Sequence, residues 1–257
     1  MARREGVDAF AGWNAEDYLR DYYSRIEAEE EHTLRFLVKH CARLKPASTL
    51  LEFGCGPTLH HVLPFSRRAE EIHVADLLPQ NLDAIRHWQA QSPRAHDWRE
   101  FTHRILCLEG LQEPTPKDIL DREDATRIAI KRRIVSDASD PRQLEVFRRH
   151  YDCVVSCYCA DSSTADKRQW GSRMRNIVSL LASGGLLLVA ALRRCQGYSV
   201  GRHWFPSAHL DECDLADVYR EAGLCDVDIE VVEVPGRSQL GFGSILLASA
   251  RRRAGCA

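Results

Sequence analysis

The sequence predicts an α/β fold, in which a Rossmann-like, doubly wound sheet of mainly parallel strands has helices on both faces. Three observations support this class. Apolar runs of strand length alternate with helical patterns along residues 46–192, which is the order of a parallel sheet. A loop with two glycines follows the first apolar run, as in nucleotide-binding sheets. Two β-rich runs lie near the end of the chain, close enough in sequence to pair antiparallel.

Length and composition fit one such domain. The chain has 257 residues, of which 44% are hydrophobic, enough for a single sizeable core with additions. Lys and Arg (35) nearly balance Asp and Glu (37), so we expect no nucleic-acid partner. The basic start of the chain lacks the apolar core of a signal peptide, and no apolar window is long enough to span a membrane. We therefore expect a cytoplasmic protein with no membrane association.

The ten cysteines do not indicate a metal centre. They are scattered, and none forms a Cys-x-x-Cys pair. Only Cys157 and Cys159 lie close, with one residue between them. Reduced thiols in a cytosol are the simplest interpretation, and no metal is expected.

Residues 11–40 are predicted to be helical. Leu19, Tyr23 and Ile26 share one face at helical spacing. Two interpretations remain open here. The tyrosines can simply cover the domain, or they can form a lid whose rings close over a cationic cofactor, because a cation is attracted to a ring face.

The segment around residues 49–59 predicts the cofactor. A short apolar strand leads into Gly54 and Gly56, and the next residues are expected to open a helix. The dinucleotide fingerprint requires a third glycine three residues after the second, but that residue is Leu59 here, and Pro57 lies between them. Pro57 suits the first turn of a helix. The loop therefore fits S-adenosylmethionine better than NAD.

An acidic residue follows the next strand at the spacing that ribose binding requires. After a predicted helix at residues 60–63, the run 71–76 reads as a strand that ends in Asp76, 20 residues after Gly56. An acidic side chain at this position accepts hydrogen bonds from ribose hydroxyls. A helix is expected next, at residues 81–88.

The middle of the chain continues the alternation. Residues 101–107 are predicted to form the third strand and residues 116–132 a charged helix, with the basic run at 131–133 on its solvated face. A short apolar stretch ends at Asp137, and residues 151–156 read as a buried strand. Ligands bind at the carboxyl ends of such strands. We therefore expect adenine and substrate beside residues that follow these two stretches, namely Asp137, Ala138, Cys157 and Asp161.

The last third of the chain completes the pattern. A helix is predicted from about residue 164 to 181, then a fully buried strand at 186–192. A polar and aromatic loop follows at 193–205, then a helix near 209–222. The two β-rich runs cover residues 227–234 and 243–250.

With these features in place, the chain resembles the family of nicotinamide, phenylethanolamine and indolethylamine N-methyltransferases. The most specific matches are residues 14–23, the loop at 54–58, Asp76 followed by residues 80–82, and the Asp97-Trp98 pair. The resemblance implies a seven-stranded sheet whose last strand is antiparallel, S-adenosylmethionine as methyl donor with S-adenosylhomocysteine as product, and a small-molecule acceptor. We expect a helical lid at about 1–45, a cofactor-binding core at 46–192, and an acceptor loop with terminal strands at 193–257, in a monomer or weak homodimer.

The resemblance, together with the strand ends, gives a set of expected site residues. For the cofactor these are Tyr18, Tyr23, Gly54, Cys55, Gly56, Thr58, Asp76, Leu77, Asn81, Asp137, Ala138 and Cys157. For the acceptor they are Tyr18, Asp161, Ala191, Tyr198, Arg202 and Ser207. Candidates for a general base are Tyr198, Asp161 and His203, and none is assigned as catalytic.

Two departures from the family pattern bear on the acceptor. Ala191 stands where the nicotinamide enzyme carries an acidic residue, and residues 240–243 offer no equivalent of the acidic pair that grips amines in the phenylethanolamine enzyme. We therefore expect an acceptor other than a cationic arylethylamine. Arg193, Arg194 and Arg202 surround the acceptor loop, which suggests an acceptor with a carboxylate.

The expected reaction is N-methylation of a carboxylate-bearing or heteroaromatic metabolite, in secondary metabolism. Three alternatives remain open. The acceptor atom can be oxygen or sulfur, or the protein can bind S-adenosylmethionine without catalysis, because fold does not fix function. A nicotinamide-dependent oxidoreductase would share the first β-α-β unit, but Leu59 and Pro57 argue against it.

Overall fold

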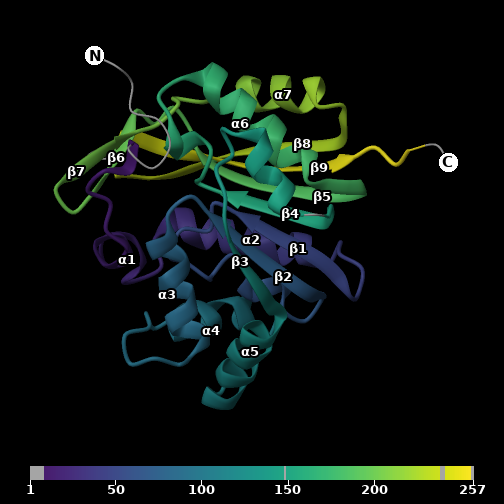
Figure 1. The fold of residues 1–257 in the computed structure, drawn as a ribbon. Helices are drawn as coiled ribbons and strands as arrows, with labels where there is room; N and C mark the ends of the chain where they lie inside the picture. Colours follow the sequence, from purple (N-terminus) through teal and green to yellow (C-terminus); the bar gives the residue numbers. More distant parts are fainter. Residues whose placement is uncertain (1–8, 148, 238–240, 256–257) are drawn as a thin grey trace.

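The computed structural model of the chain describes residues 9–147, 149–237 and 241–255. Seven strands form one mixed sheet in the order β3-β2-β1-β4-β5-β9-β8 (Figure 1). Strands β1 to β5 run parallel, and β9 runs antiparallel to both β5 and β8. Their bounds are Ser48–Phe53, Ala69–Asp76, Ile130–Val135, Tyr151–Cys157, Leu181–Leu192, Leu224–Arg237 (β8) and Phe242–Arg252 (β9). The expected seven-stranded sheet with an antiparallel last strand is confirmed.

Helices cover both faces of this sheet. The helices are α1 (Ala15–Tyr23), α2 (Ala28–Cys41), α3 (Pro79–Gln89), α4 (Arg99–Leu108), α5 (Pro116–Ala129), α6 (Lys167–Ser179) and α7 (Glu212–Glu221). Leu50 and its neighbour Leu51 on β1 point to opposite faces. Leu50 packs into the core beneath α2, α3 and α4, whereas Leu51 packs into the core beneath α6 and α7. The central strands are therefore buried on both sides and apolar almost throughout.

The prediction of a third strand at residues 101–107 is wrong, because this segment is helix α4. Its buried residues are Phe101, Thr102, Ile105 and Leu106. They recur at intervals of three and four residues, which places them on one side of a helix. A run of apolar and β-branched residues this short does not distinguish a strand from a buried helix.

The third strand is instead β3, formed by the basic run that was expected on a helix. Helix α5 ends at Ala129, and Lys131, Arg132 and Arg133 continue as a strand at the edge of the sheet. An edge strand has one side without a partner strand, and lysine and arginine there discourage pairing with other chains. Charge at this position is therefore compatible with a strand, although it gives little β signal in the sequence.

The helix expected after the glycine loop is also absent from the described structure. Residues 57–62 form turns, followed by one short 3-10 helix, η2 (Leu63–Phe65). Pro64 lies inside η2, and a proline here removes the backbone N–H that would continue an α-helix from residue 60. Pro57 therefore lies in a turn rather than in the first turn of a helix.

The two ends of the chain differ from prediction in detail. The expected helix over 11–40 is divided into α1 and α2 by residues 24–27. The loop at 193–205 contains a hairpin of strands β6 (Gly197–Val200) and β7 (His203–Pro206). Two other η segments, η3 (Pro141–Phe147) and η4 (Asp161–Ser163), flank β4. Within the described ranges, no helix is both long and apolar enough to cross a membrane.

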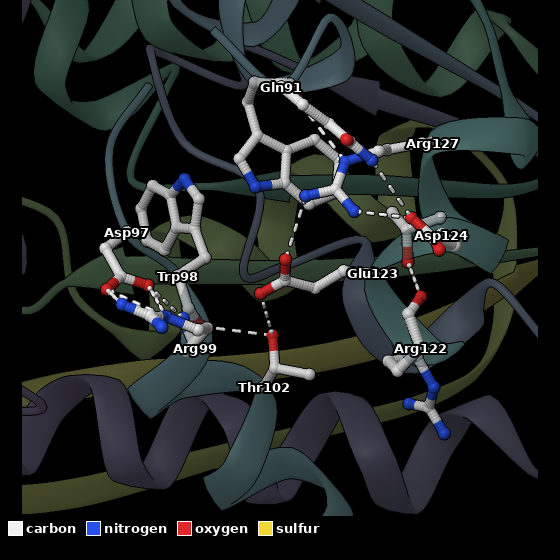
Figure 2. A network of polar contacts seen from close by, with 11 residues as sticks. Gln91, Asp97, Trp98, Arg99, Thr102, Arg122, Glu123, Asp124 and Arg127 are labelled. Atoms are coloured by element: carbon white, nitrogen blue, oxygen red, sulfur yellow. Dashed lines mark hydrogen bonds and ion pairs between the residues drawn. The ribbon is translucent and has the colours of Figure 1, made fainter. Parts of the chain in front are cut away.

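The Asp97-Trp98 pair begins helix α4, and Figure 2 shows the polar network beside it. The Thr102 hydroxyl donates to Glu123 of α5 at 3.3 Å, and the Arg127 guanidinium donates to the same carboxylate at 2.9 Å. Trp98 is buried, whereas Asp97 forms an ion pair with Arg99 at the surface. This network fixes α4 against α5 and so fixes Trp98 on the lid side of the sheet.

The fully buried guanidinium of Arg122 gives a test of this packing. It donates to Glu109 at 2.7 Å and to the carbonyl of Leu63 in η2 at 3.2 Å. Arg122→Met should lower the free energy of unfolding by about 3 kcal/mol, because the Glu109 charge loses its partner. The measurement is chemical denaturation followed by circular dichroism. Lys117→Met, which removes an exposed ion pair with Asp121, should leave the midpoint nearly unchanged; equal effects would contradict this account.

Candidate cofactor and acceptor site

A cavity lies at the carboxyl ends of β1, β2, β3 and β4, and residues of α1 and of the β6–β7 hairpin also line it. All twelve residues that the sequence predicts for the cofactor line it. Further lining residues come from residues 9–23, called the lid below, from α2, from the turn after β1, from the segments after β3 and β4, from α6 and from β9. They include Phe10, Trp13, Tyr22, Glu29, Glu30, His61, Ser136, Tyr158, Cys159, Ser162, Ser163, Arg173 and Phe242.

The glycine loop approaches the cavity with its backbone. Gly54 and Gly56 have φ angles of 76° and 58°, in the left-handed region that favours glycine. A Cβ atom on Gly54 would lie 1.9 Å from the sulfur of Cys159. The Thr58 hydroxyl donates to the carbonyl of Cys55 at 2.7 Å. The loop is therefore a tight cradle of backbone groups that only glycine at position 54 allows.

Asp76 holds this cradle in place. One carboxylate oxygen accepts from the Gly56 N–H at 2.8 Å, and the other accepts from Leu78 N–H at 2.8 Å and from the Asn81 amide at 3.0 Å. Burial raises the pKa of Asp76, and these hydrogen bonds oppose the rise. The carboxylate is thus fixed at the end of β2, where a ribose would lie in this fold.

The lid covers the cavity with aromatic rings. Trp13 donates through its indole N–H to Asn81 at 2.9 Å, and its ring lies 4.7 Å from that of Tyr18. The hydroxyls of Tyr18 and Tyr23 are 3.3 Å apart. Burial raises the pKa of Tyr18, so its hydroxyl stays protonated. The faces of these rings can attract a cationic sulfonium, so that no carboxylate is needed to bind it.

The β6–β7 hairpin lies beside α1 (Figure 1) and is hydrogen-bonded to the lid. The Tyr22 hydroxyl donates to the carbonyl of Ser199 at 2.8 Å, and the Gly201 N–H donates to Asp21 at 2.9 Å. Phe205 of the hairpin stacks with Phe10 at 5.8 Å. The lid and the hairpin therefore form one roof over the cavity.

The far end of the cavity suits an adenine. Ser136, Asp137 and Ala138 follow β3 and line it. The Ser136 hydroxyl is buried and has no hydrogen-bond partner among the described residues. A buried hydroxyl without a partner costs free energy, so a ligand that hydrogen-bonds there would be stabilising. This hydroxyl, the glycine cradle and Asp76 together fit S-adenosylmethionine.

The expected acceptor residues divide into two groups. Tyr18 and Tyr198 line the cavity, whereas Asp161, Ala191, Arg202 and Ser207 do not. Ala191 packs into the core beneath α6 and α7. Arg202 is exposed at the tip of the hairpin. The structure therefore does not bring these two side chains to the cavity.

Asp161 and Ser207 instead lie behind the residues that line the cavity and hold the backbone there in place. The Asp161 carboxylate accepts from the Leu192 N–H at 3.1 Å, and the Ser207 hydroxyl donates to the Asp161 carbonyl at 3.0 Å. Burial raises the pKa of Asp161 to about 6. These contacts join the segment after β4 to β5 and to the segment after the hairpin.

The other proposed bases and cations are also placed away from the cavity or held by partners. His203 is exposed, and Gly12 in the lid packs against its ring. Tyr198 donates to the carbonyl of Ser162 at 3.1 Å, and burial raises its pKa well above the usual value. Arg193 forms an ion pair with Glu212, and Arg194 lies 4.0 Å from Asp211. Of these four residues Tyr198 lines the cavity, whereas His203, Arg193 and Arg194 do not.

Sequence reasoning missed several lining residues, and one of them carries a backbone signal. Tyr158 adopts a φ of 51°, which is uncommon for a residue with a Cβ and often marks a functional site. Its hydroxyl lies 2.6 Å from the Thr33 hydroxyl on α2. Ser162, Ser163 and Arg173 follow from the turn after β4 and from α6, and no motif singles them out.

The cradle at Gly54 can be tested with a matched glycine. Gly184 has almost the same φ, 75°, but nothing lies near a Cβ placed there. Gly184→Ala should cost only the left-handed backbone conformation, about 1–2 kcal/mol. Gly54→Ala should cost more, because Cys159 must move, and it should also abolish binding of S-adenosylhomocysteine in calorimetry. Retained binding in Gly54→Ala would show that the cradle does not require glycine.

Asp161 makes stability depend on pH. Its pKa rises from 3.8 to about 6 on folding, so the associated stabilisation is complete below about pH 4 and is lost as pH rises through about 6. The change corresponds to about 3 kcal/mol. Asp161→Asn, which keeps an oxygen for the Leu192 N–H, should remove this loss. Thermal melts of both proteins between about pH 4 and 7 measure the difference, and parallel curves would contradict the assignment.

The chain matches known methyltransferases along most of its length. The model of the NNMT/PNMT/TEMT family matches residues 3–251. The chain is 30% identical to human nicotinamide N-methyltransferase over 228 residues, covering 86% of this chain and 85% of that enzyme. It is 25% identical to rabbit (Oryctolagus cuniculus) indolethylamine N-methyltransferase, covering 83% and 82%, and 25% identical to pig (Sus scrofa) phenylethanolamine N-methyltransferase, covering 76% and 69%.

Solved structures support the fold independently. The 1,6-didemethyltoxoflavin N1-methyltransferase of Burkholderia thailandensis, solved with S-adenosylhomocysteine, superposes with a TM-score of 0.53 at 16% identity, covering 98% of this chain and 93% of that one. The N-methyltransferase NodS of Bradyrhizobium japonicum superposes with a TM-score of 0.52 at 15% identity, covering 93% and 99%. With the family match, these establish the class of enzyme. The chain belongs to the NNMT/PNMT/TEMT family, and it is an S-adenosylmethionine-dependent methyltransferase of small molecules.

Proposed function

We propose that the enzyme methylates a ring nitrogen of a small, flat heteroaromatic molecule that carries a carboxylate. One observation carries the first part of this proposal. Trp13, Tyr18 and Tyr198 line the cavity from the lid and the hairpin, and the ring of Trp13 lies 6.3 Å from that of Tyr198. Aromatic walls of this kind favour a planar ligand through stacked and edge-to-face contacts.

The acceptor class follows from the groups that these walls offer. The Tyr198 hydroxyl is bound to a backbone carbonyl, and that of Tyr18 lies beside Tyr23. Burial keeps both hydroxyls protonated, so neither acts as a base near neutral pH. A pyridine-like nitrogen has a free lone pair and needs no proton removed. Such an acceptor therefore fits a site that contributes position rather than acid–base chemistry.

The protein's contribution is then to hold two molecules together and exclude water. S-adenosylmethionine supplies a methyl group on a sulfonium when bound. The glycine loop and Asp76 hold one side of the cavity, and the roof formed by the lid and the hairpin closes the other. Holding donor and nucleophile at attack distance in a dry site accounts for large rate enhancements without a general base.

Arg173 carries the second part of the proposal. Among the described lining residues it is the one arginine, and no lysine accompanies it. Its guanidinium donates to the carbonyl and the hydroxyl of Ser163, at 2.7 and 2.6 Å. A guanidinium at the cavity wall is the side chain best suited to pair with a carboxylate, because it matches the two carboxylate oxygens in a planar, bidentate contact. We therefore propose that Arg173 on α6 binds the carboxylate of the acceptor, rather than the arginines near the hairpin.

The relatives supply a further argument for a heteroaromatic acceptor. The name of the human relative states that it methylates nicotinamide, which is a heteroaromatic amide. The phenylethanolamine and indolethylamine enzymes act, by their names, on arylalkylamines. Glu29, Glu30, Asp76 and Asp137 do line the cavity, but Asp76 already accepts three hydrogen bonds from the protein and Glu30 is paired with His60. We therefore favour the heteroaromatic class.

The acceptor can be identified by mass spectrometry. Purified protein should transfer a deuterated methyl group from labelled S-adenosylmethionine to members of a panel of pyridine, quinoline and pteridine carboxylates, with the matching amides as controls. We expect product from the carboxylates and less from the amides. Transfer only to phenols, thiols or alkylamines would overturn the proposal, and binding of cofactor without any transfer would favour a silent binder.

Arg173 and Arg202 provide a matched pair for the carboxylate. Arg173→Met should raise the acceptor KM by about tenfold or more, the loss expected for one charged hydrogen bond, with a smaller effect on the amide analogue. Arg202→Met removes an exposed arginine of the hairpin and should leave KM unchanged. Equal KM values for the Arg173 variant and the parent enzyme would remove the carboxylate from the proposal.

A further inference from the structure

Four ionisable side chains are buried together next to the cavity. Glu30 lies in the first turn of α2, Glu52 on β1, and His60 and His61 in the turn after the glycine loop. Their exposed fractions are at most 4%. Glu30 and His61 line the cavity itself. Methyl transfer as proposed above uses none of them.

Three of these groups converge on one point. Nε2 of His60 lies 2.9 Å from Oε2 of Glu30, and Nε2 of His61 lies 3.9 Å from the same oxygen. One ligand atom from each of the three residues lies within 4.8 Å of the others. Nε2 of His61 is buried and has no hydrogen-bond partner in the described parts of the chain. A buried polar atom without a partner needs an explanation, and a bound ion is one that fits the neighbouring ligand atoms.

The three ligand atoms are close enough together to share a metal ion, although the 2.9 Å contact of His60 with Glu30 is also an ordinary hydrogen bond. Two ligands that are each about 2.0–2.2 Å from a tetrahedral ion lie roughly 3.4 Å apart. The observed 2.9 and 3.9 Å separations bracket this value. A direct hydrogen bond between His61 and Glu30 would require a shorter distance than 3.9 Å. Two histidines and one carboxylate are also a common ligand set for zinc and for iron(II).

A second carboxylate orients His61 in the way that metal sites require. Nδ1 of His61 lies 2.8 Å from Glu52. With Glu52 ionised and the His61 ring neutral, Nδ1 donates to the carboxylate and the lone pair lies on Nε2. Metal-binding histidines usually donate their other N–H to a carboxylate in this manner. The His60 ring is held separately, by stacking on Trp98 at 5.2 Å.

We propose that Glu30, His60 and His61 bind a divalent transition-metal ion of the zinc class, with an open coordination position that faces the cavity. Glu52 is a positioning residue, which acts through His61. A structural zinc site normally has four protein ligands, whereas three ligands and an open position are typical of sites that bind water or a small molecule. The ion would lie beside Tyr158, whose backbone is held in the left-handed region next to it.

Spacing in the sequence does not reveal this group. His60 and His61 are adjacent, and Glu30 lies 30 residues before His60 on another element. The common zinc signatures place their ligands at short, regular intervals. Only the packing of α2 against the turn after β1 brings the three side chains together.

The test uses the full-length protein without a histidine tag and with neither acceptor nor cofactor. Protein purified from zinc-supplemented medium should contain about one zinc ion per chain by elemental mass spectrometry. After removal by a chelator, Co²⁺ should restore a stoichiometric complex with visible d–d absorption and raise the melting temperature. Protein that carries no metal and gives no Co²⁺ band would overturn the proposal.

Variants locate the ion. His61→Phe and Glu30→Gln should abolish the Co²⁺ band, and Glu52→Gln should weaken Co²⁺ binding by about 10- to 100-fold while keeping the three ligands. His150→Ala, which removes an exposed histidine far in sequence from the group, should bind as the parent does. Full-strength binding in the folded His61→Phe or Glu52→Gln protein would place the ion elsewhere and overturn the proposal.

The proposed metal site and the proposed acceptor class can each be refuted independently of the other. Metal content and Co²⁺ absorption are measured without any methyl transfer. A protein that binds zinc but transfers no methyl group to heteroaromatic carboxylates would retain this site and refute the acceptor class. A protein that transfers the methyl group but binds no metal would do the reverse.

Discussion

The carboxylate of Asp76 holds together three parts of the molecule that are far apart in sequence. It fixes the glycine loop through Gly56 and the start of α3 through Leu78. Through Asn81 it also reaches Trp13, since the Asn81 amide donates to Asp76 while its oxygen accepts from the indole. A buried carboxylate is costly unless it is fully hydrogen-bonded. The glycine loop and the lid are thus coupled through the Asp76 carboxylate, and a substitution that displaces one of them should also displace the other.

Much of this arrangement can be predicted from the sequence, because the central strands have strong local signals. Long apolar runs bounded by glycine, as at residues 186–192, are typical of strands buried on both faces, and side chains after such strands gather at one edge. This is why the expected cofactor residues that follow β1 to β4 lie around one cavity, whereas Tyr18 and Tyr23 on α1 were expected from the family resemblance. Residues 1–5, which bear on targeting, and Leu240, which bears on the acceptor, lie outside the described residues.

The errors have physical causes too. Residues 101–107 are apolar enough for a strand, and only their packing against α5 and the lid decides for a helix. The basic strand β3 is the opposite case, because an edge position tolerates charge that a central strand would not. Arg202 was expected near the acceptor from its place in the loop at 193–205, and Ala191 from the resemblance. The β6–β7 hairpin instead turns Arg202 outwards, and the pleat of β5 turns Ala191 into the opposite core. In all four cases, contacts with other parts of the fold determine the structure more than the local sequence does.

The buried polar atoms around the cavity divide it into regions with different needs. Near β3, the Ser136 hydroxyl lacks a partner, which a neutral ligand such as adenine can supply. Near α2, Glu52 and His61 each keep one atom without a hydrogen bond among the described groups, although both are ionisable. Such atoms are expensive to leave unpaired in a core packed by Tyr23, Trp98 and Phe101. The region near α2 therefore needs a charged ligand such as the proposed metal ion, whereas the region near β3 needs a neutral hydrogen-bonding group.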